Sequence, residues 1–307
     1  MDYLKATGIV KQFSNHRALD KVDISIPENS IFGLLGPNGA GKTTFIRIIN
    51  QITAPDEGEI LLKGRKLKAE DIGIIGYLPE ERGLYKKMKV GEQALYLAQL
   101  KGLSRTDAMD KIRYWFEKFD IREWWGKKIE ELSKGMQQKV QFITTVVHEP
   151  ELLIFDEPFS GFDPINANML KNEIIELRNK GCTIIFSTHN MSSVEELCDH
   201  ISLINKAKVI LEGQIDTIKQ NYKTNTFSIG YAGDPDKLKN ALNNSYDIVG
   251  EKQNHLLHNI TIKADASTDN NELLKKIIPV VEVHTFNEII PSMNDVFIQV
   301  VEETNIQ

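Results

Sequence analysis

A glycine-rich segment between an apolar run and a helical run constrains this chain more than any other feature. Residues 36–43 read Gly-Pro-Asn-Gly-Ala-Gly-Lys-Thr, which has the spacing G-x-x-x-x-G-K-T. The apolar residues 31–35 precede it, and a helical pattern over residues 44–50 follows it. This order of strand, loop and helix is the context in which that spacing forms a phosphate-binding loop, or P-loop. The segment therefore predicts an anion site, and the alternative is an ordinary glycine-rich turn.

Each residue type in the loop suits contact with phosphate. Glycine permits backbone angles that other residues avoid, so successive N–H groups can turn toward an anion, and the helix adds the positive end of its dipole. Lys42 can bring a charge to the outer phosphates, and the hydroxyl of Thr43 can bind Mg²⁺, which prefers oxygen ligands. We expect nucleotide contacts along the whole segment: Gly36, Pro37, Asn38, Gly39, Ala40, Gly41, Lys42, Thr43 and Thr44.

Length and charge narrow the class of protein. At 307 residues the chain exceeds a typical single domain, so we expect one large domain and one small appendage. The formal net charge of -6 argues against nucleic acid as the main partner, because proteins that bind the phosphate backbone carry basic surfaces. Cys182 and Cys198 show neither metal-ligand nor disulfide spacing, which suits a reducing cytosol. We interpret both cysteines as buried apolar residues.

The sequence also bears on membrane association. No apolar run approaches the roughly 20 residues that span a bilayer. The N-terminus lacks the charged-then-apolar pattern of a signal peptide. We therefore expect a chain that is soluble, or peripheral to a membrane.

The apolar pattern of the larger part predicts an α/β fold with a mixed sheet. Residues 3–26 alternate and turn, which predicts antiparallel strands beside the P-loop strand. Phe13 lies at a turn between these strands, where the alternatives are half-buried packing and a functional contact. From about residue 88 to residue 148 strand patterns are absent, and apolar residues recur at helical spacing. This stretch predicts a helical insertion in the α/β core.

Polar residues follow two apolar strands farther along the chain. Residues 151–155 suit a strand buried on both faces, and Asp156 and Glu157 follow it. We expect this strand beside the P-loop strand, where Asp156 would hold Mg²⁺ through water and Glu157 would orient or deprotonate a water. His189 follows the next strand, and a lone histidine there is commonly structural. Strand ends of this kind are where open parallel sheets bind ligands.

The composition shifts toward Asn, Lys, Asp and Ser near Gln220. We place a domain boundary there, so that residues 1–219 form the larger domain and residues 220–307 the smaller one. The smaller domain alternates strands and helices, and residues 292–295 make a capping box for a last helix. We predict a small α+β accessory domain without a chemical motif.

With these elements in order, residues 3–213 resemble an ABC-type ATPase, the nucleotide-binding subunit of ABC transporters. Residues 132–136, Leu-Ser-Lys-Gly-Met, are similar to the family signature Leu-Ser-Gly-Gly-Gln, and they precede the Asp-Glu strand as in the family. Residues 160–163 resemble the family's D-loop, and His189 matches its switch histidine. Phe13 falls where family members stack an aromatic ring on adenine.

The resemblance implies a mechanism that the P-loop alone does not give. Two nucleotide-binding domains close head to tail, so that Ser133 and Gly135 at a helix N-terminus meet the γ-phosphate held by the partner's P-loop. ATP stabilises the dimer, and hydrolysis releases it. Within one chain Glu157 is the implied base, and His189 contacts the γ-phosphate. The alternatives for the working pair are a homodimer and a heterodimer.

Three features depart from the family pattern. Lys134 and Met136 replace a glycine and the glutamine of the signature, whereas Ser133 and Gly135 remain. Glu80 stands where the family has glutamine. A carboxylate can bind Mg²⁺ but lacks an amide donor, so the alternatives are a metal contact and a solvated loop acid. The C-terminal domain is similar to tails of bacterial ATPases of the sodium-export and multidrug-export type.

Two functions from different classes are compatible with this resemblance. The first is a transporter motor that uses ATP and Mg²⁺, binds a separate membrane permease at the cytoplasmic face and drives export. A single nucleotide-binding domain favours it, as does a helical insertion of the kind that docks on permease loops. The second is a soluble ABC ATPase that acts on ribosomes or DNA, a type that carries a basic linker between paired domains, long coiled coils or zinc cysteines. The sequence contains none of these features, so we expect the transporter motor.

Overall fold

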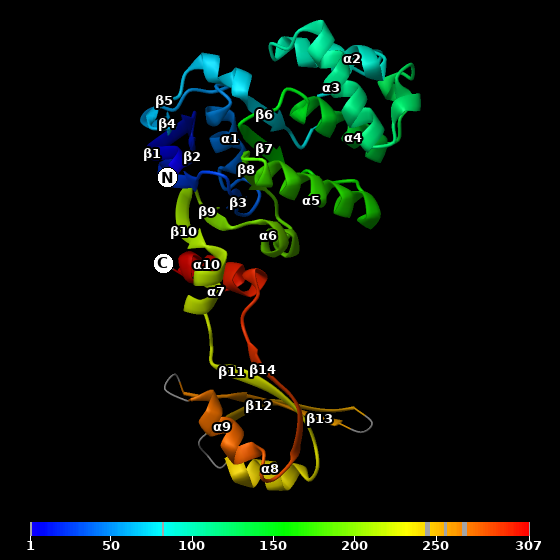
Figure 1. Ribbon diagram of the computed structural model, residues 1–307. Coiled ribbons are helices and arrows are strands. Elements are labelled where there is room, and N and C mark those ends of the chain that lie inside the picture. Colours follow the sequence, from blue (N-terminus) through cyan, green and yellow to red (C-terminus); the bar gives the residue numbers. More distant parts are fainter. Residues whose placement is uncertain (1, 82, 243–245, 255–256, 266–268, 307) are drawn as a thin grey trace. The chain divides into compact units, whose positions relative to one another are not determined.

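The computed structural model describes residues 2–81, 83–242, 246–254, 257–265 and 269–306 (Figure 1). Two compact units make up the chain. The first runs to Ile215 and includes the chain from Val300 on, and the second covers Asp216–Gln299. The predicted domain boundary at Gln220 falls within helix α7 (Ile215–Asn221).

A six-stranded sheet forms the centre of the first unit. Its strands are β3 (Ile31–Leu35), β6 (Ile75–Leu78), β7 (Leu152–Asp156), β8 (Thr183–Ser187), β9 (His200–Asn205) and β10 (Lys208–Gln214). They lie in the order β10-β9-β3-β8-β7-β6, and all neighbours are parallel except β10 and β9. Every residue of β3, β7 and β8 is buried, as expected for parallel strands covered on both faces.

The predicted pairing of β7 with the P-loop strand β3 is wrong. Strand β8 lies between them, because Ile184 pairs with Ile31 of β3 on one side and with Leu153 of β7 on the other. Strand β9 takes the second edge of β3, so β3 has no edge left for β7. All of these strands still run parallel, and their carboxyl ends therefore meet at one edge of the sheet.

The N-terminal strands form a second sheet. It consists of β1 (Asp2–Phe13), β2 (His16–Pro27), β4 (Glu57–Leu62) and β5 (Arg65–Lys66), in the order β2-β1-β4-β5. All pairs are antiparallel, as predicted. Their expected place beside β3 is wrong, because parallel strands occupy both edges of β3. The predicted α/β class is confirmed, with a mixed central sheet and additional antiparallel strands.

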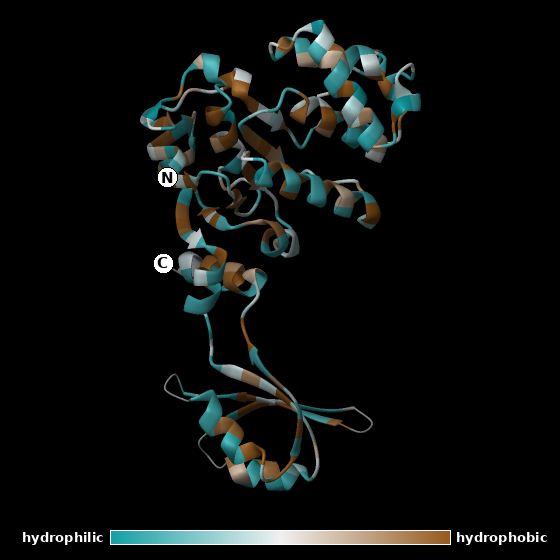
Figure 2. Cartoon of the chain, viewed as in Figure 1, coloured by the Kyte–Doolittle hydropathy of each residue, from teal (hydrophilic) through white to brown (hydrophobic). Residues whose placement is uncertain are grey.

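Helix α1 (Lys42–Ile49) packs with apolar residues of both sheets. It buries Phe45, Ile46, Ile48 and Ile49, and these side chains share one cluster with residues such as Leu4 and Ile154. Figure 2 shows the apolar colouring of the strands and of this helix. The P-loop is therefore attached at both ends to the buried core, through β3 before it and α1 after it.

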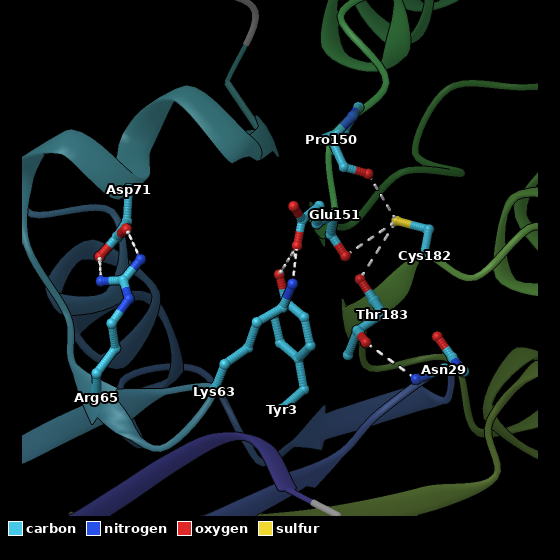
Figure 3. Close-up of polar contacts among 9 residues, drawn as sticks. All are labelled: Tyr3, Asn29, Lys63, Arg65, Asp71, Pro150, Glu151, Cys182 and Thr183. Carbon is cyan, nitrogen blue, oxygen red and sulfur yellow. Dashed lines mark hydrogen bonds and ion pairs between the residues drawn. The ribbon is translucent and has the colours of Figure 1, made fainter.

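A polar contact ties the second sheet to the central one (Figure 3). The Tyr3 hydroxyl donates to Oε2 of Glu151 at 3.3 Å, and Lys63 forms an ion pair with the same oxygen. The Lys63 Nζ atom also lies 5.3 Å from the centre of the Tyr3 ring. Burial raises the pKa of Tyr3, and the nearby Glu151 carboxylate raises it further. Glu151, which precedes β7, therefore holds Tyr3 of β1 and Lys63 of the turn after β4.

The predicted helical insertion is present and packs on the central sheet. Its main helices are α2 (Val90–Leu100), α3 (Arg105–Lys118) and α4 (Lys134–Val146). Phe142 of α4 stacks on Phe155 of β7, with ring centres 5.7 Å apart and planes at 24°. Helices α5 (Pro164–Asn179) and α6 (Met191–Leu197) complete the first unit. Within the described ranges, no helix combines the length and apolar character that crossing a membrane requires.

The second unit has the predicted α+β character. Its strands are β11 (Thr226–Ala232), β12 (Asp247–Asn254), β13 (Leu257–Lys263) and β14 (Glu282–Ile289), and its helices include α8 (Pro235–Leu242) and α9 (Asn270–Ile277). The antiparallel order β12-β13-β11-β14 gives the split βαβ arrangement called ferredoxin-like. Helix α10 (Met293–Ile306) begins with the predicted capping box, in which Asp295 N–H donates to Ser292 Oγ at 3.2 Å.

Candidate functional site

Two glycines of the P-loop stand where only glycine fits. Gly36 has a φ of 144°, and a Cβ atom there would lie 2.1 Å from the carbonyl oxygen of Ile204. Gly41 has a φ of 122°, and a Cβ atom would lie 2.4 Å from the carbonyl oxygen of Ala18. Gly41 is also the N-cap of α1 and offers no side-chain cap. The first N–H groups of this helix are therefore suited to bind an anion.

Lys42 is buried inside the loop that it closes. Its Nζ atom donates to the carbonyl oxygens of Gly36 at 2.7 Å and Pro37 at 3.1 Å. Burial lowers the pKa of Lys42, and the carboxylates of Asp156, Glu157 and Glu80 act in the opposite direction. The ammonium group thus shares one pocket with these three acidic residues.

A pocket of about 260 Å³ collects most of the predicted site residues at the carboxyl edge of the central sheet. The predicted residues Gly36, Pro37 and Ala40 belong to the same loop without lining this pocket. His16 and Ala18 also line the pocket and were not predicted. No motif marks His16, and only the pairing of β1 with β2 places it opposite Phe13. The lining residues are Phe13, His16, Ala18, Asn38, Gly39, Gly41, Lys42, Thr43, Thr44, Glu80, Asp156, Glu157 and His189.

Three acidic residues face the loop. Asp156 is the last residue of β7 and is buried, whereas Glu80 is exposed in the loop that follows β6. Burial raises the pKa of Asp156, and the charges of Glu80 and Glu157 raise it further. Close negative charges of this kind favour a cation between them.

The carboxylate of Glu157 is fixed by the residues that follow β8. Its Oε2 atom accepts a hydrogen bond from Thr188 Oγ1 at 3.1 Å. Its Oε1 atom accepts from the backbone N–H of His189 at 2.8 Å and lies 2.7 Å from His189 Nδ1. The imidazole of His189 is 78% exposed. Glu157 is thus oriented from one neighbouring strand end, while His189 keeps its ring open to a ligand.

Phe13 lines the pocket together with the acids. It is 45% exposed, so part of its ring is accessible to a ligand. The Lys11 Nζ atom lies 5.4 Å from the ring centre. An exposed aromatic face beside a phosphate loop can stack on a flat heterocycle.

The predicted signature residues lie outside this pocket. Ser133 is the N-cap of α4, and its Oγ atom accepts from Met136 N–H at 3.3 Å. Gly135 lies in the first turn, where a Cβ atom would be 3.8 Å from the carbonyl oxygen of Gly161. The structure brings Gly135 close to Gly161 of the predicted D-loop. Neither Ser133 nor Gly135 lines the pocket at the P-loop of the same chain.

The loop, the buried lysine and the acidic strand ends define a nucleotide-phosphate site of the P-loop class. Comparison with known proteins narrows this class. A family profile described as ABC transporter matches residues 19–160, and one described as the C-terminal domain of DrrA1-3-like ATP-binding proteins matches residues 213–301.

Curated relatives and solved structures agree with these profiles. The uncharacterized ABC transporter ATP-binding protein YhaQ of Bacillus subtilis is 50% identical over 70% of this chain and 72% of its own length. The bacitracin transport ATP-binding protein BcrA of Bacillus licheniformis is 32% identical over 71% of each chain. The solved structure of an ATP binding subunit of an ABC transporter aligns with a TM-score of 0.67 and 29% identity, covering 72% of this chain and 93% of the other.

These matches show the family. The chain belongs to the ABC transporter ATP-binding proteins, and the resemblance inferred from its motifs is confirmed.

Proposed function

We propose that this chain is the ATP-hydrolysing subunit of an ABC transporter, that it dimerises on ATP, and that it powers export through a separate membrane permease. One observation carries the dimerisation. The pocket holds Lys42, Glu157 and His189, but Ser133 and Gly135 lie outside it in the same chain. A signature that cannot reach its own P-loop is suited to bind the nucleotide of a second subunit.

The chemistry of the pocket suits ATP. The loop from Gly36 to Thr44 offers N–H groups to the phosphates, and the Lys42 ammonium supplies a charge to the outer ones. Phe13 lines the same pocket, where its exposed ring would stack on adenine.

The residues present fit a magnesium ion. Asp156 is buried yet lines the pocket together with Thr43 and Glu80, so hydroxyl and carboxylate oxygens converge there. Among the described residues no group of three or more His, Cys, Asp or Glu side chains could hold a metal by itself. Magnesium typically takes one or two carboxylates and completes its shell with substrate phosphates and water. Bound there, it would neutralise charge on the phosphates.

Glu157 is the proposed base for the attacking water, and His189 the proposed contact to the γ-phosphate. The bonds from Thr188 and from the His189 backbone hold the Glu157 carboxylate in one orientation. A carboxylate in this position can accept a proton from water or orient it for attack. The exposed ring of His189 would donate to a phosphate oxygen through Nε2–H, which requires a hydrogen on both ring nitrogens because Nδ1 faces the Glu157 carboxylate.

Membership of this family supports a permease partner at the cytoplasmic membrane face. BcrA, a relative over most of this chain, is named for the transport of bacitracin. We propose that the helical insertion of α2 to α4 provides the permease contact, and that residues 220–307 form an accessory domain. The dimer pairs either two copies of this chain or this chain with a related one.

The central test uses Glu157→Gln. This variant keeps the shape of the side chain but loses the base, so it should bind ATP, hydrolyse it at least 10²-fold more slowly, and run as a dimer in size-exclusion chromatography with ATP. Lys42→Ala should lose ATP affinity and stay monomeric. The exposed Glu59→Gln is the matched control and should behave as wild type. Wild-type turnover by Glu157→Gln would refute the assignment of the base.

The permease is tested separately. Tagged chain, expressed in its host and purified from membranes in mild detergent, should carry with it a polytopic membrane protein in defined stoichiometry. Recovery of the chain entirely from the soluble fraction, without such a partner, would count against the transporter role.

A further inference from the structure

Two buried glutamines on α4 contact the backbone next to two acidic residues of the pocket. Gln138 and Gln141 stand three residues apart, a spacing that puts both side chains on one face of the helix. They are only 2% and 4% exposed. Gln138 Nε2 donates to the carbonyl oxygen of Pro158 at 3.2 Å, and Gln141 Nε2 donates to that of Pro79 at 3.1 Å.

The two carbonyl groups belong to neighbours of the acidic residues in the pocket. Pro158 directly follows Glu157, and Pro79 directly precedes Glu80. One helix therefore holds the backbone beside both acids. Glu157 itself has a positive φ of 51°, an uncommon value for a residue other than glycine, so its backbone depends on the surrounding contacts.

The orientation of each amide follows from its partner. A backbone carbonyl can only accept a hydrogen bond, so the NH₂ end of each side chain must face it. The Thr144 and Thr145 hydroxyls both donate to the backbone carbonyl of Gln141 at 2.9 Å, which fixes this turn of the helix. Phe142, directly after Gln141, stacks on Phe155 of β7. Helix α4 is thus firmly attached where the amides leave it.

The same helix begins at the signature. Ser133 is the N-cap of α4, and Gln138 lies little more than one turn beyond it. A displacement of the N-terminal end of α4 is therefore passed through a stiff helix to Pro158 and Pro79. The bond to Pro158 is buried and the bond to Pro79 is partly buried. A movement of the helix would therefore also shift the backbone beside Glu157 and Glu80.

From these contacts we infer that Gln138 and Gln141 are positioning residues, which set Glu157 and Glu80 according to the position of the signature helix. The inference rests on the proposed function, because it assigns to α4 a part in ATP hydrolysis. In a dimer, the signature of one chain would contact the ATP in the partner's P-loop. Through α4 it would also adjust Glu157 and Glu80, which act on the ATP in its own P-loop. The two sites would be coupled through a single helix in each chain.

The test uses Gln138→Met and Gln141→Met in the full-length chain with its membrane partner. Methionine keeps the length of the side chain and removes the donor. Gln93→Met is the matched control, because Gln93 is also buried, on α2, and accepts one hydrogen bond from Tyr85 N–H at 3.0 Å. Melting temperatures and ATP affinity are measured for all three variants alongside kcat and the KM for ATP.

Gln138→Met should lower kcat about tenfold, a size typical of a displaced catalytic group, with KM and ATP affinity within twofold of wild type. Gln141→Met should raise the Mg²⁺ concentration needed for half-maximal activity several-fold. Gln93→Met should change the melting temperature by a similar amount and leave kcat and the Mg²⁺ dependence unchanged.

Equal kcat in Gln138→Met and Gln93→Met would overturn the inference, as would a loss of kcat matched by an equal loss of ATP affinity. If Gln138→Met does not fold, the Mg²⁺ dependence of Gln141→Met decides alone, and a wild-type value overturns the inference. Absence of ATP hydrolysis by the wild type would instead refute the proposed function, and the inference would fall with it.

Discussion

The Nδ1 atom of His189 lies 2.7 Å from Oε1 of Glu157, and the same carboxylate oxygen accepts the backbone N–H of His189 at 2.8 Å. The histidine therefore contacts the acid twice, once through its ring and once through its backbone. Removal of the ring leaves the backbone bond and the bond from Thr188 in place. The orientation of Glu157 and the contact to phosphate can for this reason be separated by mutation.

His189→Ala should lower kcat by about 10²-fold, the effect of losing one donor to a developing charge. The affinity for ATP should stay within about threefold, because the P-loop and Lys42 remain. Single-turnover hydrolysis and equilibrium binding of a fluorescent ATP analogue measure the two quantities. His284→Ala, in the second unit, serves as the control. A variant with unchanged kcat would show that the His189 ring makes no contact that matters in the transition state.

Phe13→Ala should weaken ATP binding by about tenfold, since stacking on one base contributes about 1–3 kcal/mol. Phe13→Trp should keep the affinity, because it preserves a flat ring at the same place. Binding of inorganic triphosphate, which has no base, should be equal in all three proteins. Isothermal titration calorimetry with ATP and triphosphate measures both effects. Equal losses for the two ligands would mean that Phe13 supports the loop rather than the base.

Glu80→Gln addresses the position at which this chain departs from its family. If the carboxylate of Glu80 contributes to the metal site, the substitution removes a negative charge and should raise the Mg²⁺ concentration for half-maximal activity several-fold. The neighbouring Glu81→Gln is the control. Unchanged Mg²⁺ dependence and unchanged activity would leave Glu80 as a solvated loop acid.

His148 should make the stability of the chain depend on pH. Burial lowers the pKa of His148 to about 4, and the positive charges of Lys101 and Lys111 act in the same direction. Below the ordinary value of 6.5 the unfolded chain binds a proton that the folded chain refuses, so this residue's contribution to stability is present above pH 6.5 and is lost as the pH falls toward 4.

The loss amounts to at most about 3 kcal/mol, since each pKa unit corresponds to roughly 1.4 kcal/mol. His148→Gln should flatten the free energy of unfolding between pH 6.5 and pH 4 relative to wild type. Urea denaturation at several pH values in this window measures the slope. Parallel slopes for the two proteins would contradict the prediction.

Local chemistry explains what could be predicted from the sequence. The P-loop combines its residue types within eight positions, and its flanking strand and helix are equally local, so the site of Lys42 and Thr43 was predictable. The acids were predictable by type, because Asp156 and Glu157 directly end an apolar run. Ser133 as an N-cap and the capping box at Ser292 likewise depend on neighbours along the chain.

Relationships between distant segments were not predictable in the same way. The sequence of β8 does not say which two strands it separates, so β7 was wrongly placed next to β3. The predicted alternation of strands and helices in the smaller domain left out β12, which is followed directly by β13. Its described side chains are exposed and its apolar alternation is weak. His16 has no motif, and only the pairing of β1 with β2 brings it opposite Phe13. The contacts of Gln138 and Gln141 could not be predicted, because their partners Pro158 and Pro79 are distant in the sequence.

Because β8 pairs with β7, the relative position of Glu157 and His189 depends on a short part of the chain. Glu157 leaves β7, α5 crosses over, and His189 follows β8, so both partners belong to one strand–helix–strand crossover. The loop that must close to bring them together is short compared with the whole domain, and its entropic cost is correspondingly small. The geometry of the pair is therefore set by the length and seating of a single helix. An insertion or deletion in α5 would displace the two partners relative to each other while leaving every residue of the P-loop unchanged.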